Sequence, residues 1–576
     1  MKKSLLIVVS ILAFACAGRT ASADETPWLW VYAPTNFLVN ENADHLIDLM
    51  KRAKKAGYTA FVVSDTKFAR LADHNGDRPP SYFDNMRRTA KAADEIGIEI
   101  IPMVGSFGYS NDILQNDPNL AEGLAVRDCP FVVRDGKAAP EDANLLPAGD
   151  FETFKGDNPA GWDYVDGPGK SAFADAEVKH GGKRSLRFEN FKAGNESGNA
   201  RAMKKIAVQS WRQYHLSLWL KTRDVDPIGD LHVAVMAPDG HELNYAFLGA
   251  KATQDWTQEH VVFNSLGNDS ITVSMGLWGG RRGVFWLDDV ELRPAGGINL
   301  LRREGCPLRV TNEDGGVEFT EGKDFERWTD PKMGVVPWPG NYEVYHAVPP
   351  IVVAKGSRIH DGDRLKVSYY HTQTVYDGEV CCCLSDDHVF KYFEDTLKGI
   401  NKVFHPKKIF VSHDEIRLAN QCELCRSRKL TAGGVLADHV RRCVKLIHEV
   451  VPDAEVIDWN DMFDPYHNAV DKYYLVGGTL AKSWEGLDKS VIVANWNSGK
   501  AAESLKFFAG RGNTQVIAGY YDTDDVKAEV GHWAEAAHGV TGVRGYMYTT
   551  WRNDYKDLEK YAEAVRQATG GKDARP

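Results

Sequence analysis

The sequence has 576 residues, of which 43% are hydrophobic and 26% are charged, and its formal net charge is −11. This length exceeds that of one ordinary domain, so we expect roughly two to four domains in a soluble globular protein. An acidic chain without a block of basic residues argues against a nucleic-acid partner.

The N-terminus has the pattern of a secretory signal peptide. Lys2 and Lys3 precede an apolar run at 5–15, and Ala21-Ser22-Ala23 offers a small-residue cleavage site. The run is too short to span a bilayer, so we expect no membrane span there. We expect residues 1–23 to be removed on export, to the periplasm or outside the cell. Lipoprotein anchoring through Cys16 is the less favoured alternative, because the preceding residues match a lipoprotein cleavage box poorly.

Residues 24–143 show strand-like and helix-like segments in alternation, as in a parallel sheet whose faces are covered by helices. The expected strands are 28–33, 59–64 and 98–104, and the expected helices are 43–56 and 82–96. We interpret this region as the first part of a (β/α)8 barrel.

Residues 144–296 change character: short strand-like segments are separated by Gly, Asp, Asn and Pro turns, which predicts a β-sandwich. Its opening NLLPAGDFE (144–152), its middle YHLSLWLKT (214–222) and its closing WLDDVEL (286–292) resemble the carbohydrate-binding jelly-roll modules appended to many glycoside hydrolases. That resemblance implies a jelly-roll fold and, less specifically, glycan binding. Residues 297–385 are interpreted as a β-rich connecting segment that packs over the active site.

The alternation resumes over residues 386–570, before a short tail, 571–576, that we expect to be disordered. Five further strands are expected at 407–412, 454–459, 491–496, 515–521 and 545–551. With the three earlier strands they complete the set of eight that closes a barrel. The predicted fold is therefore an α/β (β/α)8 TIM barrel, interrupted after its third strand by an all-β jelly-roll sandwich.

The stretch KKIFVSHDEIR (407–417) ends an apolar strand on two adjacent acids, Asp414 and Glu415. In such barrels the carboxyl ends of the strands carry the active site, so we take these acids as the catalytic candidates. An alternative is a helix N-terminus with Ser412 as its cap and the acids complementing the helix dipole.

Acidic, amide and aromatic side chains also follow the ends of other barrel strands. Aromatic faces suit sugar rings, and carboxylates bind hydroxyls and perform acid/base chemistry, so the expected partner is a carbohydrate. The substrate-binding candidates are His413, Arg417, Trp459, Asp461, Trp496, Tyr521, Asp522, Trp551 and Asp65. Neither an HxH nor an HExxH motif occurs, so we expect no catalytic metal, and no cofactor.

The segments INKVFHP (400–406) and IFVSHDE (409–415) resemble the region before the Asp-Glu pair of family 20 glycoside hydrolases, the β-N-acetylhexosaminidases. The later aromatic and acidic residues Trp459, Tyr521, Asp522 and Trp551 fall in that family's order. Two glycines of that family are replaced here by Ser412 and His413, so related families, such as the family 123 N-acetylgalactosaminidases, are equally compatible.

The resemblance implies a retaining, substrate-assisted hydrolase of N-acetylated hexosamine glycans. In such an enzyme the 2-acetamido oxygen of the substrate is the nucleophile, so the two acids lie side by side rather than straddling the sugar. Glu415 would be the general acid/base, and Asp414 would orient the acetamido group. Tyr521 would bind the acetamido carbonyl, and Asp522 a sugar hydroxyl.

Two alternatives remain open for the function. In a two-carboxylate retaining glycosidase acting on sugars without an acetamido group, Glu415 would be the acid/base and Asp522 the nucleophile. In a non-catalytic glycan-binding protein, neither acid would have a chemical role.

The cysteines permit three interpretations. Eight follow the expected cleavage site, and Cys422 and Cys425 form a CxxC motif shortly after the acid pair. A structural zinc site is conceivable, but a single CxxC is a weak signal, so disulfides or buried thiols are favoured.

Overall fold

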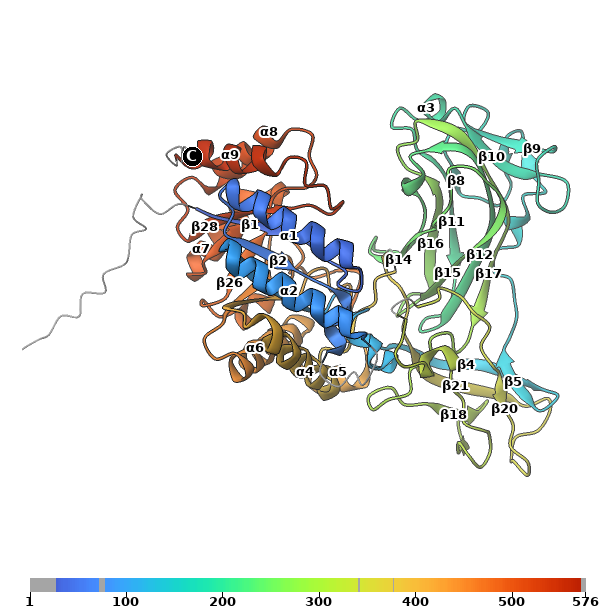
Figure 1. The fold of residues 1–576 in the computed structure, drawn as a ribbon. Helices are drawn as coiled ribbons and strands as arrows, with labels where there is room; N and C mark the ends of the chain where they lie inside the picture. Colours follow the sequence, from blue (N-terminus) through green and yellow to red (C-terminus); the bar gives the residue numbers. More distant parts are fainter. Residues whose placement is uncertain (1–26, 72–77, 340–341, 377, 571–576) are drawn as a thin grey trace, which may run out of the picture.

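A computed structural model describes residues 27–71, 78–339, 342–376 and 378–570. The expected signal peptide with Cys16 and the expected tail lie outside the described residues. Figure 1 shows a barrel beside a group of β-sheets. Among the described residues, no helix has the length and apolarity that crossing a bilayer requires.

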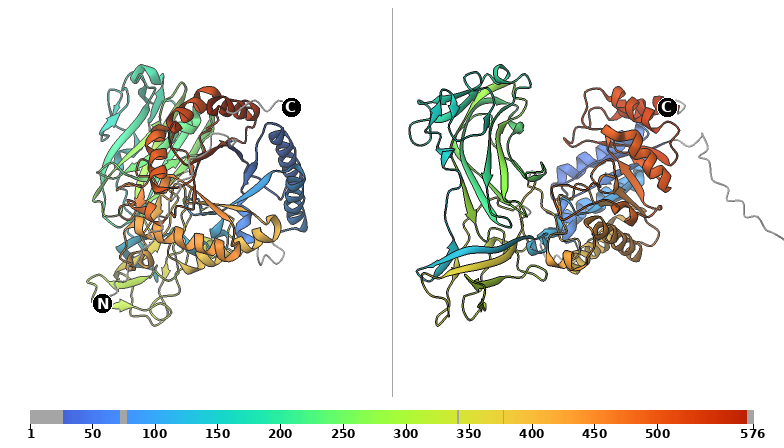
Figure 2. Two further views of the ribbon diagram at one scale, coloured as in Figure 1. Left: turned by 90° about the vertical axis from the view of Figure 1, so that its left-hand side faces the viewer. Right: turned by 180° about the vertical axis from the view of Figure 1, so that it is seen from behind.

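The barrel consists of eight parallel strands that close in sequence order, which confirms the predicted fold class (Figure 2, left). The strands are β1 (Trp28–Tyr32), β2 (Ala60–Val63), β3 (Glu99–Ser106), β22 (Lys408–Ser412), β24 (Glu455–Trp459), β26 (Ile492–Asn495), β27 (Gln515–Ile517) and β28 (Val543–Thr549). Alternate residues fill the barrel interior, including Val62, Ile101 and Phe410, and the others pack against the helices. Because both faces are buried, the strands are continuous apolar runs in the sequence.

The helices that cover the barrel follow the amphipathic segments of the sequence. They are α1 (Asn40–Lys55), α2 (Pro80–Ile96), α4 (Asp387–Phe404), α6 (Ala432–Val450), α7 (Ala501–Arg511), α8 (Val526–Ala537) and α9 (Leu558–Thr569). Between β24 and β26 the chain forms only short 3-10 turns and the two-residue strand β25 (Leu475–Val476). The connection between these two strands is therefore a long loop without a covering α-helix.

The insertion after β3 contains the predicted sandwich, made of two five-stranded sheets. One sheet has the order β15 (Gln254–Asn264), β12 (Gln213–Asp226), β17 (Arg282–Ala295), β10 (Ser185–Glu189) and β9 (Ala172–Asp175). The other has the order β14 (Glu242–Phe247), β13 (Leu231–Met236), β16 (Ser270–Leu277), β11 (Ala200–Ala207) and β8 (Tyr164–Val165). All pairs within the two sheets are antiparallel, and the apolar sides of their strands form the sandwich core.

A third sheet supports the sandwich and differs from the expected division at residue 143. Its order is β19 (Glu318–Phe319), β18 (Arg309–Asn312), β21 (Arg364–His371), β4 (Leu124–Arg134), β5 (Lys137–Pro140) and β20 (Ile351–Val352). β4 and β5 precede residue 144, yet they pair with the 297–385 segment rather than with the barrel. The insertion therefore leaves the barrel soon after β3 and returns just before α4.

Candidate active site

The acid pair lies in a turn at the end of β22, not at a helix N-terminus. Glu415 has a φ of 49°, a left-handed conformation that is uncommon for a residue with a side chain. Gly108, in the loop after β3, packs directly against this turn: a Cβ on Gly108 would lie 1.9 Å from the carbonyl oxygen of Asp414. The backbone of the turn is therefore fixed by a close contact that only glycine permits.

Both acids open into one cavity of about 1010 Å³ at the carboxyl ends of the barrel strands. Of the residues proposed from the sequence, its lining includes Asp414, Glu415, Arg417, Asp65, Trp459, Trp496, Tyr521, Asp522 and Trp551. The structure thus brings together a side chain of β24 and side chains from the loops that follow β2, β22, β26, β27 and β28. A cavity of this size accommodates a sugar ring with its neighbours.

Glu415 is held from two sides. Tyr109 donates its phenolic hydrogen to Oε2, and Arg417 pairs with Oε1 at 2.7 Å. Burial nevertheless raises the pKa of Glu415 to about 7, and the charge of Asp414 adds to this rise. A carboxyl group that exchanges its proton near neutral pH is suited to general acid/base catalysis.

Asp414 lies beside Glu415, and its pKa is also raised. Its Oδ1 accepts a hydrogen bond of 2.5 Å from the Ser412 hydroxyl. Burial raises the pKa of Asp414 to about 7, with a further contribution from the nearby charge of Asp461. Burial also raises the pKa of Asp461 to about 7. Three acids within one low-dielectric site therefore cannot all be charged at neutral pH without mutual cost.

Two of the proposed substrate-binding residues, His413 and Asp461, lie behind the cavity and not in its lining. His413 is fully buried: its Nδ1 is 2.7 Å from Asp458 Oδ2, and its Nε2 is 3.0 Å from His439 Nδ1. Asp461 is also fully buried and accepts a 2.8 Å hydrogen bond from the backbone N–H of Glu415. Its other oxygen accepts from Trp496 Nε1 at 3.3 Å. Both residues support the acid pair and its aromatic surroundings from beneath.

Aromatic rings form a wall along the cavity. Trp459 donates from Nε1 to Ser412 Oγ at 3.1 Å, which links it to the Asp414 side. Tyr521 lies between Trp496 and Trp551, with ring centroids 6.1 and 6.2 Å away. Tyr521 is 43% exposed and Trp551 48% exposed, so both rings present open surface to a ligand.

The two remaining carboxylates of the lining already have protein partners. Asp522 accepts from the Thr550 hydroxyl at 2.5 Å and from the Trp551 backbone N–H at 2.9 Å. Asp65 accepts from the Phe37 backbone N–H at 3.0 Å and from Lys67 Nζ at 2.8 Å. These bonds fix the position of both groups at the rim.

Three further residues of the site were not among the residues proposed from the sequence. Tyr109, in the loop after β3, reaches Glu415, while Tyr376 and Glu379 come from the end of the insertion. Glu379 is fully buried on its side chain and pairs with Arg417 Nη1, and the Arg417 guanidinium lies 4.3 Å from the Tyr376 ring centroid. Tyr376 and Glu379 lie far from the barrel strands in the sequence, so no local pattern connects them with the site. Tyr109 directly follows a barrel strand, a position where rim residues are expected.

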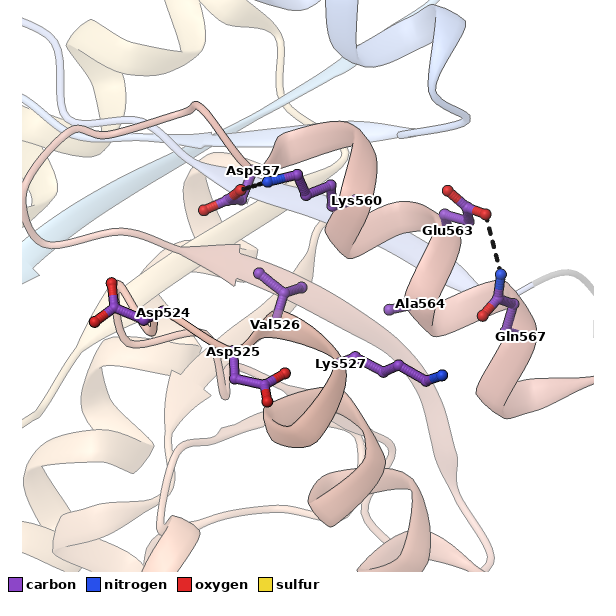
Figure 3. Close-up of a pocket in the computed structure, with 9 residues that line it drawn as sticks. All are labelled: Asp524, Asp525, Val526, Lys527, Asp557, Lys560, Glu563, Ala564 and Gln567. Atoms are coloured by element: carbon purple, nitrogen blue, oxygen red, sulfur yellow. Dashed lines mark hydrogen bonds and ion pairs between the residues drawn. The ribbon is translucent and has the colours of Figure 1, made fainter.

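A smaller hollow of about 320 Å³ lies on the surface between α8 and α9 (Figure 3). Its side chains are mainly charged and partly paired with one another, as in the 2.7 Å contact between Lys560 and Asp557. It contains none of the proposed site residues, so the candidate site is the large cavity.

No family model matches the sequence, and no curated protein matches it significantly. Among solved structures, a β-N-acetylhexosaminidase is similar at 9% identity, covering 95% of this chain and 71% of its own, with a TM-score of 0.35. A rhamnosidase from Novosphingobium is similar at 11% identity, covering 96% of this chain and 59% of its own, with a TM-score of 0.33. The xylan-binding CBM22-1 domain from Paenibacillus barcinonensis is similar at 17% identity, covering 27% of this chain and 98% of its own, with a TM-score of 0.21. Similarities at this level do not identify the family of this chain.

Proposed function

We propose that this protein is a glycoside hydrolase that cleaves N-acetylated hexosamine glycans by retaining, substrate-assisted catalysis. The observation that carries the proposal is the placement of Asp414 and Glu415 side by side in one cavity walled by tryptophan and tyrosine. Neighbouring acids on the same side of a sugar suit a mechanism in which the substrate supplies its own nucleophile.

Glu415 is the proposed general acid/base. Its carboxyl group is protonated over part of the neutral range, because burial raises its pKa to about 7. The proton passes to the glycosidic oxygen as the bond breaks, and the resulting carboxylate then takes a proton from the incoming water. Tyr109 and Arg417 hold the two oxygens and stabilise the carboxylate that this step produces.

Asp414 is the proposed partner of the acetamido group. As the acetamido oxygen attacks the anomeric carbon, the acetamido nitrogen gains positive charge, and a carboxylate beside it stabilises that charge. Ser412 fixes one oxygen of Asp414, which leaves the other available. Tyr521 would donate to the acetamido carbonyl, and Trp459 and Trp551 would stack against the ring.

The alternative mechanism makes Asp522 a nucleophile, since it lines the same cavity as Glu415. Its two oxygens each accept at least one protein hydrogen bond, which stabilises a fixed carboxylate. Such a carboxylate is equally able to bind a sugar hydroxyl, the role that we propose for it.

A panel of aryl glycosides, with and without the 2-acetamido group, tests the proposal. We expect hydrolysis of the acetamido sugars only, and loss of two or more orders of magnitude in kcat/KM in Glu415→Gln. Equal turnover of plain glucosides or galactosides would instead support the two-carboxylate mechanism, which also predicts that Asp522→Asn is inactive. If the wild type hydrolyses none of the glycosides, and if Glu415→Gln binds glycans as the wild type does, the protein is a glycan-binding protein without catalytic activity.

We also propose that the protein is exported and that the sandwich contacts the glycan on which the barrel acts. The signal-peptide pattern of residues 1–23 supports export. The sandwich is tested separately by measuring the binding of soluble glycans to full-length protein in which Trp551 of the cavity is mutated. Binding that remains in this variant would support a contact between the sandwich and the glycan.

A further inference from the structure

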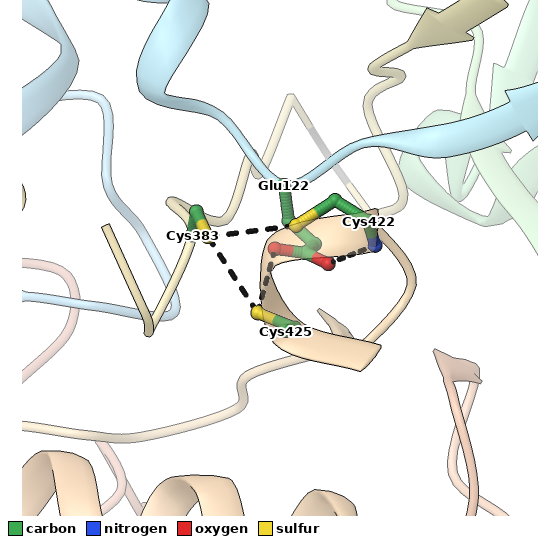
Figure 4. A group of neighbouring side chains, drawn as sticks. All are labelled: Glu122, Cys383, Cys422 and Cys425. Atoms are coloured by element: carbon green, nitrogen blue, oxygen red, sulfur yellow. Dashed lines mark hydrogen bonds between the residues drawn. The ribbon is translucent and has the colours of Figure 1, made fainter. Parts of the chain in front are cut away.

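Four buried side chains from three distant segments meet at the base of the insertion (Figure 4). They are Glu122, Cys383, Cys422 and Cys425, and their donor atoms all lie within 4.8 Å of one another. Glu122 precedes β4, where the insertion leaves the barrel. Cys383 precedes α4, where the insertion returns, and the two other cysteines lie in and beside the short helix α5 (Glu423–Ser427) after the acid pair.

We propose that these four side chains bind one structural zinc ion. This inference goes beyond the proposed glycosidase function and does not depend on it. Three thiolates and one carboxylate are a donor set that zinc accepts, and thiolates in particular select zinc over calcium or magnesium.

The spacing of the donors suits a tetrahedral ion. The Cys383 sulfur lies 3.6 Å from that of Cys422 and 3.5 Å from that of Cys425. Sulfur atoms bound to one zinc ion at about 2.3 Å lie about 3.8 Å apart at tetrahedral angles. A disulfide would instead require about 2.05 Å. The eight cysteines of the described residues are all buried, and none of them forms a disulfide.

Glu122 is oriented as a metal-binding carboxylate. Its Oε1 accepts 2.7 Å hydrogen bonds from the backbone N–H groups of Gln421 and Cys422. Its Oε2 is turned toward the sulfurs and lies 3.6 Å from Cys425 Sγ. Hydrogen bonds that fix one oxygen and leave the other toward the ion are typical of the shell around a metal site.

A buried cation and a hydroxyl group lie beside the four donors. The buried Arg303 guanidinium lies close enough to the cluster to interact with Cys422 and Glu122. Arg303 is itself anchored to the backbone oxygens of Asn119 and Ala121. On the other side, Ser385 Oγ lies 3.2 Å from Cys425 Sγ, and Arg428 donates to that hydroxyl. Four ionised donors buried together would repel one another, and a zinc ion among them would offset that repulsion.

The position of the cluster indicates a structural role. All four coordination positions would be filled by protein, whereas catalytic zinc keeps one position open. The outgoing and returning strands of the insertion already pair there, through the 2.8 Å bonds from Glu122 N to Cys381 O and from Cys383 N to Leu120 O. Zinc would connect these two paired segments to the loop that follows Glu415, and would thereby fix the position of the insertion relative to the acid pair.

Metal analysis of the full-length protein, purified without chelator, tests the proposal. We expect about one zinc per chain in native mass spectra and elemental analysis, and replacement by cobalt should give the intense visible bands of a tetrahedral thiolate site. Cys383→Ser and Cys425→Ser should lose the metal, while Cys129→Ser, which removes a buried thiol in β4, should retain it.

The wild-type measurements decide the question even if the cysteine variants fail to fold. Wild-type protein without zinc, from zinc-supplemented culture, would overturn the proposal. Peptide mapping that finds a disulfide between any two of Cys383, Cys422 and Cys425 would also overturn it. Chelation should lower the Tm of the wild type and of Cys129→Ser equally; a wild-type Tm that does not respond to loss of bound zinc would contradict the structural role.

Discussion

The hydrogen bond from Tyr109 to Glu415 gives a prediction about the pH dependence of catalysis. A general acid must carry its proton, so activity should fall as the pH rises through the pKa of Glu415, which is about 7. The Tyr109 hydroxyl donates to the carboxylate and therefore holds that pKa below the value that burial alone would give. In Tyr109→Phe the alkaline limb of the kcat profile should move to higher pH.

The size of this movement follows from the bond that is lost. A hydrogen bond to a charged group stabilises it by about 1.5–3 kcal/mol. One pH unit corresponds to about 1.4 kcal/mol, so the limb should move up by roughly one to two units. Because Asp414 titrates in the same range, the measured limb belongs to the pair of acids, and the lower end of this range is expected.

The assay is the pH profile of kcat for an aryl glycoside that the wild type hydrolyses. Tyr32→Phe is the matched control, because Tyr32 lines the same cavity and has no hydrogen bond to Glu415. Its alkaline limb should coincide with that of the wild type. A limb that stays in place or moves to lower pH in Tyr109→Phe would refute the assignment of Glu415 as the acid that loses its proton.

Three further changes have defined outcomes. Trp551→Ala removes an exposed ring and should raise KM for a glycan roughly tenfold in steady-state assays, with the Tm unchanged. Gly108→Ala places a Cβ 1.9 Å from the Asp414 carbonyl oxygen, so the acid turn must shift by about 1 Å, and kcat should fall roughly 100-fold. In the wild type, the raised pKa of Asp414 makes the stability depend on pH. Between about pH 4 and 7 the folded state keeps a proton on Asp414 that the unfolded state has released, so the free energy of unfolding falls as the pH rises through this range. Asp414→Asn removes this loss of stability, so the Tm of the variant minus that of the wild type should be greater at pH 8 than at pH 5. A smaller difference at pH 8 would contradict a raised pKa of Asp414.

The sequence predicted the barrel well because its signals are local. Apolar runs such as those of β22 and β24 are strands buried on both faces, and amphipathic helices such as α4 separate them. The pairing of β4 with β21 could not be predicted in the same way. Residues that pair between these strands, such as Leu124 and His371, are far apart in the sequence, and no local pattern distinguishes a third sheet from the sandwich.

The candidate site was predictable to the extent that its residues follow strand ends. Trp459 and Trp551 were predicted in this way, because a residue at the end of a predicted barrel strand is expected to lie at the rim of the barrel. His413 also follows a strand end, but Asp458 and His439 bind both of its ring nitrogens and keep it buried. Whether a rim side chain points into the cavity or beneath it depends on such partners, which come from other strands.

The turn at Glu415 explains how adjacent acids share one cavity. On an extended strand, neighbouring side chains point to opposite sides, so Asp414 and Glu415 would diverge. The left-handed conformation of Glu415 breaks this alternation, at a cost of roughly 1–2 kcal/mol. Asp461 offsets that cost by accepting the Glu415 N–H, and Gly108 leaves room for the Asp414 carbonyl. The buried charge of Asp461 also helps to raise the pKa of Asp414, so the group that secures the backbone of the acid pair adjusts its proton affinity as well.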